Sequence, residues 1–108
     1  MATNYKVLAQ ANPAATTNTT LYTNATANGA VCSTLAICNQ STTTNVRVAV
    51  RPAGATLTAS QYIVYDTYVN ANDTLFLTIG TTLANTDVIT CYAGTANVSF
   101  SLFGSEIT

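Results

Sequence analysis

The sequence offers few side chains for acid–base chemistry. Its carboxylates are Asp66, Asp73, Asp87 and Glu106, and hydrolysis of a glycosidic bond would need two of them held on either side of that bond. Asp73 and Asp87 each precede a predicted strand and follow Asn-rich residues, where a short carboxylate accepts hydrogen bonds from turn amides. Histidine, the commonest general base and metal ligand, is absent. We therefore expect a protein that is not an enzyme and that binds no cofactor or metal.

Three cysteines are the next reactive groups. Cys32, Cys38 and Cys91 are an odd number, and their spacing matches no zinc or redox motif. Cys32 and Cys38 are separated by an even number of positions, so on one regular strand they would face the same way, about 20 Å apart. A bridge from Cys91 to a neighbouring strand remains open. We expect free thiols that pack as small hydrophobes.

The two arginines share one face of a predicted strand. Arg47 and Arg51 alternate with the valines of residues 46–51, which would hold the strand against the core and leave both guanidinium groups available to a partner. Arginine is enriched at interface anchors. The candidate interface residues are therefore Arg47 and Arg51, together with Tyr5 and Lys6 near the N-terminus. The alternative is that the arginines are solvated.

Aromatic and amide side chains could also bind ligands. The six tyrosines could form a sugar-stacking platform or an interface patch, although packing in and around the core fits better because most of them lie in predicted strands. Five Asn-x-Ser/Thr sequons occur, but chance produces them in a chain this rich in Asn and Thr. They are at Asn18, Asn24, Asn39, Asn72 and Asn97.

The elements that would position these side chains are strands. Period-two alternation of apolar residues is clearest in residues 46–51, 75–79 and 98–102. Residues 31–38, 62–65 and 88–92 are more continuously apolar, as in strands covered on both faces by a second sheet or a neighbouring subunit. Residues 5–9 and 20–23 are predicted edge strands. Turn residues separate these runs, and one short helical turn over residues 83–87 is the most helix that we expect.

Composition gives the fold class and the domain organisation. The chain has 108 residues, of which 48% are hydrophobic and only 6% charged. Its polar residues are mainly Thr and Asn, and Thr favours strands, whereas the usual polar helix formers are scarce. We predict a single all-β domain over residues 1–108, an antiparallel β-sandwich of about seven or eight strands. An N-terminal arm and an ordered C-terminal tail are possible additions.

Charge excludes some classes of partner. Three basic residues and a formal net charge of −1 cannot neutralise a phosphate backbone, so we expect no nucleic acid. No apolar run approaches the roughly 20 residues of a membrane span, and the start of the sequence lacks the basic-then-apolar order of a signal peptide. A surface with so few charges favours association with other proteins.

Several stretches of the sequence resemble small virion proteins of tailed phages, most of all the capsid cement, or decoration, proteins of cyanophages. The resemblance covers nearly the whole chain, but it consists of strand and turn patterns that carry no catalytic residue. It is seen in residues 10–13, 19–23, 35–39, 47–54, 62–66, 72–74 and 98–104.

The resemblance implies a protein of the virion that is made in the host cytoplasm and stabilises the capsid from its outer surface. Its implied partners are the major capsid protein and copies of itself, as a homo-oligomer in the particle. Two alternatives remain open at this point. One is a structural protein of the phage tail or baseplate, and the other is a carbohydrate-binding module for host recognition.

Overall fold

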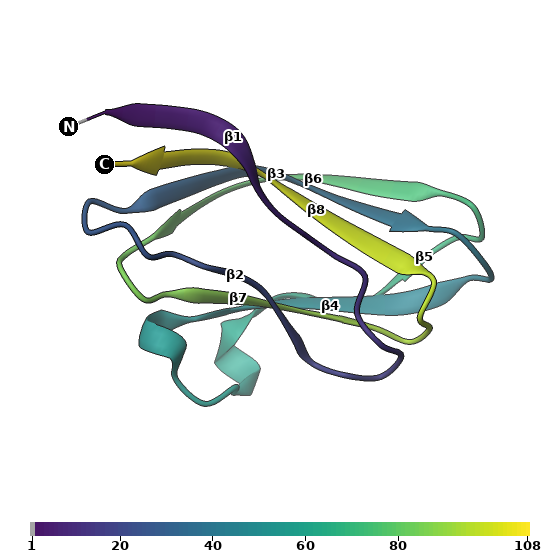
Figure 1. Cartoon of the computed structure of the whole chain (residues 1–108). Coiled ribbons are helices and arrows are strands. Elements are labelled where there is room, and N and C mark those ends of the chain that lie inside the picture. The colour runs from purple at the N-terminus through teal and green to yellow at the C-terminus, as the bar shows by residue number, and fades with distance from the viewer. Residues whose placement is uncertain (1) are drawn as a thin grey trace.

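The computed structural model describes residues 2–108 and consists almost entirely of β-strands (Figure 1). Two four-stranded antiparallel sheets pack face to face, which confirms the predicted β-sandwich. The strands are β1 (Thr3–Ala11), β2 (Thr19–Thr23), β3 (Ala30–Asn39), β4 (Thr44–Arg51), β5 (Tyr62–Val69), β6 (Thr74–Leu83), β7 (Val88–Ala93) and β8 (Val98–Ile107). Two short 3₁₀ turns, η1 (Pro52–Gly54) and η2 (Ala59–Gln61), lie between β4 and β5.

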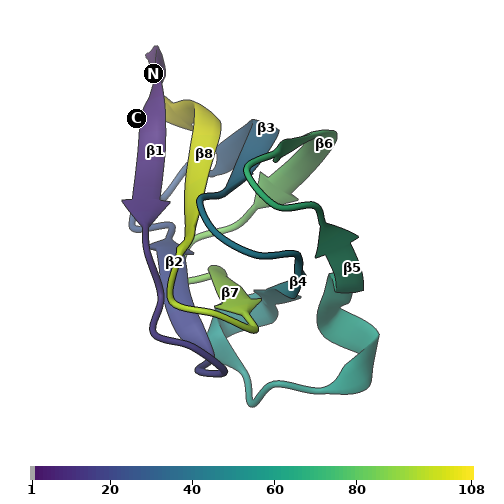
Figure 2. The same cartoon turned by 90° about the vertical axis from the view of Figure 1, so that its right-hand side faces the viewer.

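The strand order is that of a jelly roll. Sheet A has the order β1-β8-β3-β6, and sheet B has the order β2-β7-β4-β5. The antiparallel pairs are nested around the β4–β5 hairpin, because β3 pairs with β6, β2 with β7 and β1 with β8. This nesting of two Greek keys defines the eight-stranded jelly roll. Figure 2 shows β1 and β2 at one side of the two layers and β5 and β6 at the other.

Each of the eight apolar runs identified in the sequence lies within a strand. Strands β1 and β2 are edge strands, as predicted, and the N-terminal segment forms β1 instead of an arm. The C-terminal segment is ordered as part of β8 and pairs with β1, where the backbone amides of Ala2 and Thr108 donate to each other's carbonyls at 2.7 and 2.8 Å.

The structure narrows two local expectations. Residues 83–87 form no helical turn, because Thr86 has a left-handed backbone with φ of 72° and Asp87 closes a tight turn by donating its N–H to the carbonyl of Ala84. Strand β5 is not covered on both faces within the chain, because it is an edge strand and Ile63 and Tyr65 are exposed. Cover by a neighbouring subunit stays a prediction for β5.

The core lies between the sheets and is formed by alternate residues of the strands. Phe100 and Leu102 of β8 are completely buried, as are Val46 and Val48 of β4, so the predicted inward faces are confirmed. Burying a side chain of this size stabilises the fold by about 1.5–3 kcal/mol. The apolar residues of β6 are only partly buried, because that strand lies at an edge.

A β-bulge changes which way one cysteine faces. The register of β3 against both β6 and β8 shifts between Cys32 and Thr34. The extra residue, Ser33, reverses the alternation, so Cys32 is buried in the core whereas Cys38 lies on the outer face. The expectation that Cys32 and Cys38 face the same way was therefore wrong. All three thiols are free in the structure, as predicted.

Two buried asparagines fasten the loops at the two ends of the sandwich. The Asn24 amide lies between the β2–β3 loop and the β6–β7 loop, and it donates to the carbonyls of Leu83 and Ala84 at 3.3 and 3.0 Å. The Asn39 amide links the β3–β4 loop to the end of β5, where it donates to Val69 at 3.0 Å. Burial makes both sequons inaccessible to a glycosyl group and explains these two asparagines structurally.

The turn aspartates do what the sequence predicted. The carboxylate of Asp87 accepts hydrogen bonds from the backbone N–H groups of Ala53 and Ala84, both at 2.8 Å. That of Asp73 accepts one from Thr74 at 2.8 Å. These bonds satisfy amides that the strand ladders leave free.

We predict that Asn39→Ala lowers the free energy of unfolding by about 2–4 kcal/mol, because it leaves buried carbonyls, including that of Val69, without a donor. Urea denaturation would measure the loss. The matched control is Asn18→Ala, which removes an exposed sequon asparagine and should change the free energy by less than about 0.5 kcal/mol. Equal effects of the two substitutions would contradict a structural role for Asn39.

The thiols should differ in reactivity. Burial raises the pKa of Cys32 to about 11 and that of Cys91 to about 12, so neither supplies thiolate at pH 8. We predict that an alkylating reagent modifies only Cys38 in the folded protein and all three thiols after unfolding without reductant. Mass spectrometry would count the adducts, and Cys38→Ser should abolish labelling of the folded protein. A single adduct after unfolding would instead reveal a disulfide.

Candidate interaction surface

The four candidate interface residues lie on different parts of the molecule. Arg47 and Arg51 project from β4 on the outer face of sheet B, opposite the buried valines of that strand. Tyr5 lies on the outer face of sheet A, and Lys6 follows it along β1. The structure therefore places both arginines on the outer face of sheet B, in separate contacts, whereas Tyr5 and Lys6 point to opposite sides of β1. The four residues do not form one surface.

Arg47 is the centre of an aromatic and carboxylate cluster on sheet B. Its guanidinium carbon lies 4.5 Å from the ring centroids of both Tyr65 and Tyr92, so that the cation is held by two π-faces. Its Nε and Nη2 donate to the two carboxylate oxygens of Asp66 at 2.5 and 3.2 Å. Asn45 donates a further bond to Asp66 at 2.8 Å.

The backbone of β5 explains how Asp66 reaches this cluster. Asp66 has a left-handed φ of 52°, and the register of β5 against β4 shifts on that stretch. Aspartate tolerates this conformation better than most residues. Hydrogen bonds from Arg47 and then Asn45 lower the pKa of Asp66, and the bond to Asp66 raises the pKa of Arg47. The pair is therefore fully ionised at neutral pH.

Arg51 holds the β4–β5 connection onto sheet B. Its Nε and Nη2 donate to the carbonyls of Ala55 and Gly54 at 2.7 and 2.9 Å, and its Nη1 lies 3.4 Å from the Thr90 hydroxyl. Figure 1 shows this connection, with both 3₁₀ turns, below β4 and β7. It explains why Thr90, although it faces outward, is buried.

The expectation that both guanidinium groups remain available was wrong, because each is bonded within the chain. Sequence reasoning could not foresee this, since the partners of Arg51 are backbone carbonyls and Asp66 reaches Arg47 only through an irregular strand. The interface role of the arginines stays a prediction. Their contacts assign them a structural role in sheet B.

The tyrosines of sheet B do not form a flat platform for sugars. The rings of Tyr62 and Tyr65 lie edge to face, with an interplanar angle of 74°. Stacking a sugar needs an accessible ring face, and one face of Tyr65 is covered by Arg47. Tyr62 and Tyr65 also line a hollow with residues of the β4–β5 connection, which leaves an edge of the cluster open to solvent.

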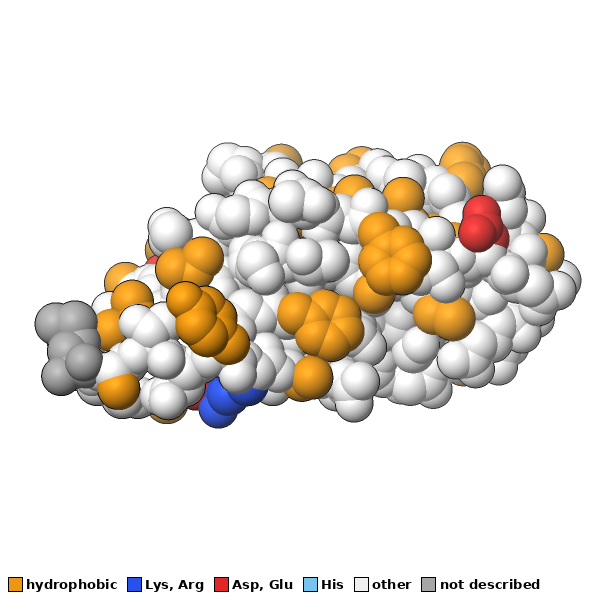
Figure 3. Space-filling view, turned by 90° about the horizontal axis from the view of Figure 1, so that it is seen from above, with side chains coloured by type: hydrophobic (Ala, Val, Ile, Leu, Met, Phe, Trp, Pro, Cys, Tyr) orange, Lys and Arg blue, Asp and Glu red, His pale blue; other side chains and the backbone are white. Residues whose placement is uncertain are grey.

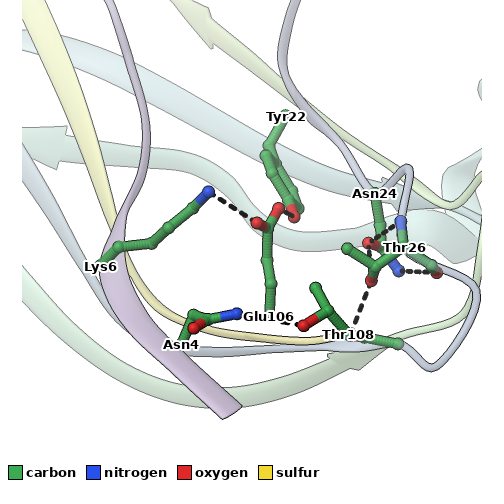
Figure 4. Close-up of polar contacts among 8 residues, drawn as sticks. Asn4, Lys6, Tyr22, Asn24, Thr26, Glu106 and Thr108 are labelled. Atoms are coloured by element: carbon green, nitrogen blue, oxygen red, sulfur yellow. Dashed lines mark hydrogen bonds and ion pairs between the residues drawn. The ribbon is translucent and has the colours of Figure 1, made fainter. Parts of the chain in front are cut away.

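Lys6 belongs to a polar cluster at the side of the sandwich (Figure 4). Its Nζ lies 2.6 Å from Glu106 Oε1, and the hydroxyl of Tyr22 donates to the other oxygen of the same carboxylate. These residues come from β1, β2 and β8, so the cluster connects the edge strands of the two sheets through Glu106. Hydrogen bonds from Lys6 and Tyr22 lower the pKa of Glu106, whereas burial and Glu106 raise that of Tyr22.

The outer face of sheet A is uncharged and carries exposed hydrophobic side chains among uncharged polar ones. Figure 3 shows hydrophobic side chains along this face and few charged groups, which lie near its margins. Tyr5 is 85% exposed and Phe76 is 71% exposed. The strand register places both on the same sheet face. Side chains on this face, from β1 to β6, include those of Tyr5, Val7, Phe103, Thr34, Ala36 and Phe76.

The sequence analysis named Tyr5 as a candidate interface residue, without assigning it to a face, and did not name Phe76 or Phe103. Phe76 occupies an outward position of the predicted strand 75–79, whereas Phe103 directly follows the predicted strand 98–102 and continues its alternation. An aromatic residue at an outward position was the available signal.

Comparisons of the chain with protein-family models, curated proteins and solved structures found no significant match. The resemblance to phage cement proteins therefore stays a prediction. Within residues 2–108, no group of three His, Cys, Asp or Glu side chains is arranged to hold a metal ion. No helix in that part of the chain is long and apolar enough to cross a membrane.

We predict that acid weakens the fold through Glu106. The pKa of Glu106 is lower in the folded chain than in the unfolded chain, so the folded state binds fewer protons. The contribution of Glu106 to stability is therefore fully present above the unfolded pKa of about 4.5. It is lost as pH falls through the folded pKa. The loss should be on the order of 1 kcal/mol, because Lys6 is half exposed.

Melting temperatures between pH 7 and pH 3 would measure the effect. Glu106→Gln should be less stable than the wild type at pH 7 and show a shallower fall in acid. Parallel curves for Glu106→Gln and the wild type would contradict a stabilising role for the Glu106 carboxylate.

Proposed function

We propose that this chain is a structural protein of a virus particle, a capsid cement protein that binds the outer surface of an assembled tailed-phage shell. The observation that carries the proposal is the outer face of sheet A, where exposed aromatic rings occur without charged side chains between them. A surface of this kind is suited to burial against another protein. The jelly-roll strand order is compatible with the proposal, since this architecture occurs in viral capsid proteins and in lectins.

The energetics of such a contact favour a repeated assembly. Full burial of one exposed ring, such as Tyr5 or Phe76, contributes about 1.5–3 kcal/mol before the cost of association is counted. One copy would therefore bind modestly. In a shell with many equivalent sites, contacts to more than one capsid subunit would add, so modest contacts suffice to hold each copy.

The outer face of sheet B is the less suitable place for the shell contact. It has an ion pair and cation–π contacts that are satisfied within the chain. Protein partners gain little from groups that are already paired, whereas the rings of Tyr5 and Phe76 on sheet A are exposed. We therefore place the shell contact on sheet A, with Tyr5 in it, and give Arg47 and Arg51 a structural role.

The alternative functions differ in what supports them. A tail or baseplate protein would use the same apolar face, so only the position in the particle separates that function from capsid cement. A carbohydrate-binding module would be favoured by the hollow beside Tyr62 and Tyr65. The perpendicular rings and the guanidinium group on Tyr65 weigh against sugar stacking there.

The test is retention on particles. We predict that Tyr5→Ser with Phe76→Ser reduces retention at least tenfold while the melting temperature of the free protein changes by less than about 3 °C, because both side chains are exposed. Particles from a lysate in which the chain is produced would be stripped of it, mixed with wild-type or variant protein and sedimented. Cryo-electron microscopy would show whether the bound copies lie on the head or on the tail.

Two variants serve as controls. Ile63→Ser with Tyr68→Ser removes exposed apolar side chains from β5 of sheet B and should leave retention unchanged. Arg47→Ala with Arg51→Ala should lower the melting temperature, because it breaks the contacts of both guanidinium groups. Loss of retention in the sheet B variants alone would move the contact to that sheet, and absence of wild-type protein from particles would refute the function.

A further inference from the structure

Strand β6 presents an open edge of sheet A. It pairs with β3 on one side, and no strand among residues 2–108 pairs with its other side. From Thr74 to Thr78 the pairing with β3 is regular, and the register shift comes only where Gly80 adopts a φ of 56°. Along this regular stretch, alternate backbone N–H and C=O groups point to solvent, where water bonds to them in the monomer and a second strand can replace that water along the whole edge.

The other three edges of the sandwich are protected. Strand β1 has Lys6 and a register shift against β8, and β2 has only five residues and a shift against β7. Strand β5 has two register shifts against β4 and the left-handed Asp66. Charges, bulges and short length are the devices by which proteins prevent pairing at sheet edges. The regularly paired part of β6, residues 74–78, has none of them.

The side chains of this stretch are complementary to themselves. Leu75, Leu77 and Ile79 point towards the core but remain partly exposed at the edge. Phe76 and Thr78 point to the outer face, and both are exposed. No residue of β6 is charged. A second copy of the same strand would therefore meet no like charge and would bury the leucines and the isoleucine further.

We propose that two copies of this chain associate through antiparallel pairing of their β6 edges, with Leu77 on the two-fold axis, to form one continuous eight-stranded sheet from two copies of sheet A. In the paired sheet, inward residues must lie opposite inward residues of the partner. A two-fold axis perpendicular to the sheet meets this condition only if one residue lies opposite its own copy. With Leu77 on the axis, Leu75 lies opposite the partner's Ile79 and Phe76 lies opposite the partner's Thr78. Aromatic residues and β-branched residues form favourable cross-strand pairs.

Neighbouring registers fit less well. An axis at Phe76 would place Asp73 opposite the partner's Ile79, which desolvates a carboxylate beside an apolar side chain. An axis at Thr78 would place Phe76 opposite the partner's Gly80, where the strand is bulged. The register on Leu77 uses the regular stretch and avoids both.

The interface is small, so the isolated dimer should be weak. Pairing of about five residues from each chain falls below the roughly 1,200 Å² of a stable complex. We expect dimers at protein concentrations on the order of 0.1–1 mM and monomers at low micromolar concentration. The inference does not rest on the proposed function, because it concerns the purified chain and needs no viral shell.

Sedimentation velocity across this concentration range tests the inference. Wild-type protein should shift from monomer to dimer, and Phe76→Lys with Thr78→Lys should weaken the dimer at least tenfold. The two lysines of one strand would lie opposite those of the partner strand, where like charges repel. The matched control is Tyr5→Lys with Thr82→Lys, which adds the same charge to the same face of sheet A outside the paired stretch and should dimerise like the wild type.

Amide chemical shifts of the wild type locate the contact without any substitution. Raising the concentration should move the signals of residues 74–79 and leave those of β1, β2 and β5 in place. A chain that stays monomeric at 1 mM overturns the inference. The inference is also overturned if the Phe76→Lys and Thr78→Lys variant still dimerises, or if the Tyr5→Lys and Thr82→Lys control does not. Concentration-dependent shifts of signals from β1, β2 or β5 would overturn it as well.

Discussion

Burial of alternate side chains between the two sheets is the interaction on which the rest of the structure depends. With so few charged residues and no disulfide, the chain has little other than its core and its backbone hydrogen bonds to offset the entropy of folding. The completely buried residues, among them Leu35, Ile89 and Phe100, come from strands of both sheets. Each strand therefore contributes one face to the core and leaves the other face to be shaped by different demands.

The nested topology makes that core cooperative. Among the eight strands, β4 and β5 are the only pair that are neighbours both in the sequence and in a sheet. The pair formed by β1 and β8 joins the two ends of the chain. Such pairing over long sequence separations yields contacts only after large loops have closed. Buried amides at Asn24 and Asn39 then connect loops that are distant in the sequence. They fix the ends of the sandwich, which the strand ladders do not reach.

Period-two alternation predicted β4, β6 and β8, because a sheet with one buried face imposes that period on its residues. The other five strands were predicted from continuously apolar runs and from two short edge segments. Alternation failed where the backbone departs from the ideal pleat. The bulge at Ser33 reversed the orientation of Cys32 relative to Cys38, and the left-handed Asp66 turned a carboxylate towards Arg47. A bulge depends on the partner strand as much as on its own residues, so its position does not follow from a single segment.

The candidate site was predictable to a smaller extent. Tyr5 was named as a candidate and stays one, whereas the contacts of Arg47 and Arg51 depend on a carboxylate and on carbonyls that only the folded chain brings near. A strand pattern shows which way a side chain points. It does not show whether another part of the chain occupies that position first, as the β4–β5 connection does on sheet B.

This difference between the two outer faces has a consequence for assembly. On sheet B, paired arginines and a folded-back connection use the polar groups that a partner would need. On sheet A, Phe76 lies on the open edge strand β6 and Tyr5 lies on the opposite edge strand β1 of the same outer face. Pairing at that edge would leave the face uncovered and place two copies of it side by side in one plane. A partner that binds the face would then engage both copies at once, and the second contact would form at the high effective concentration set by the first.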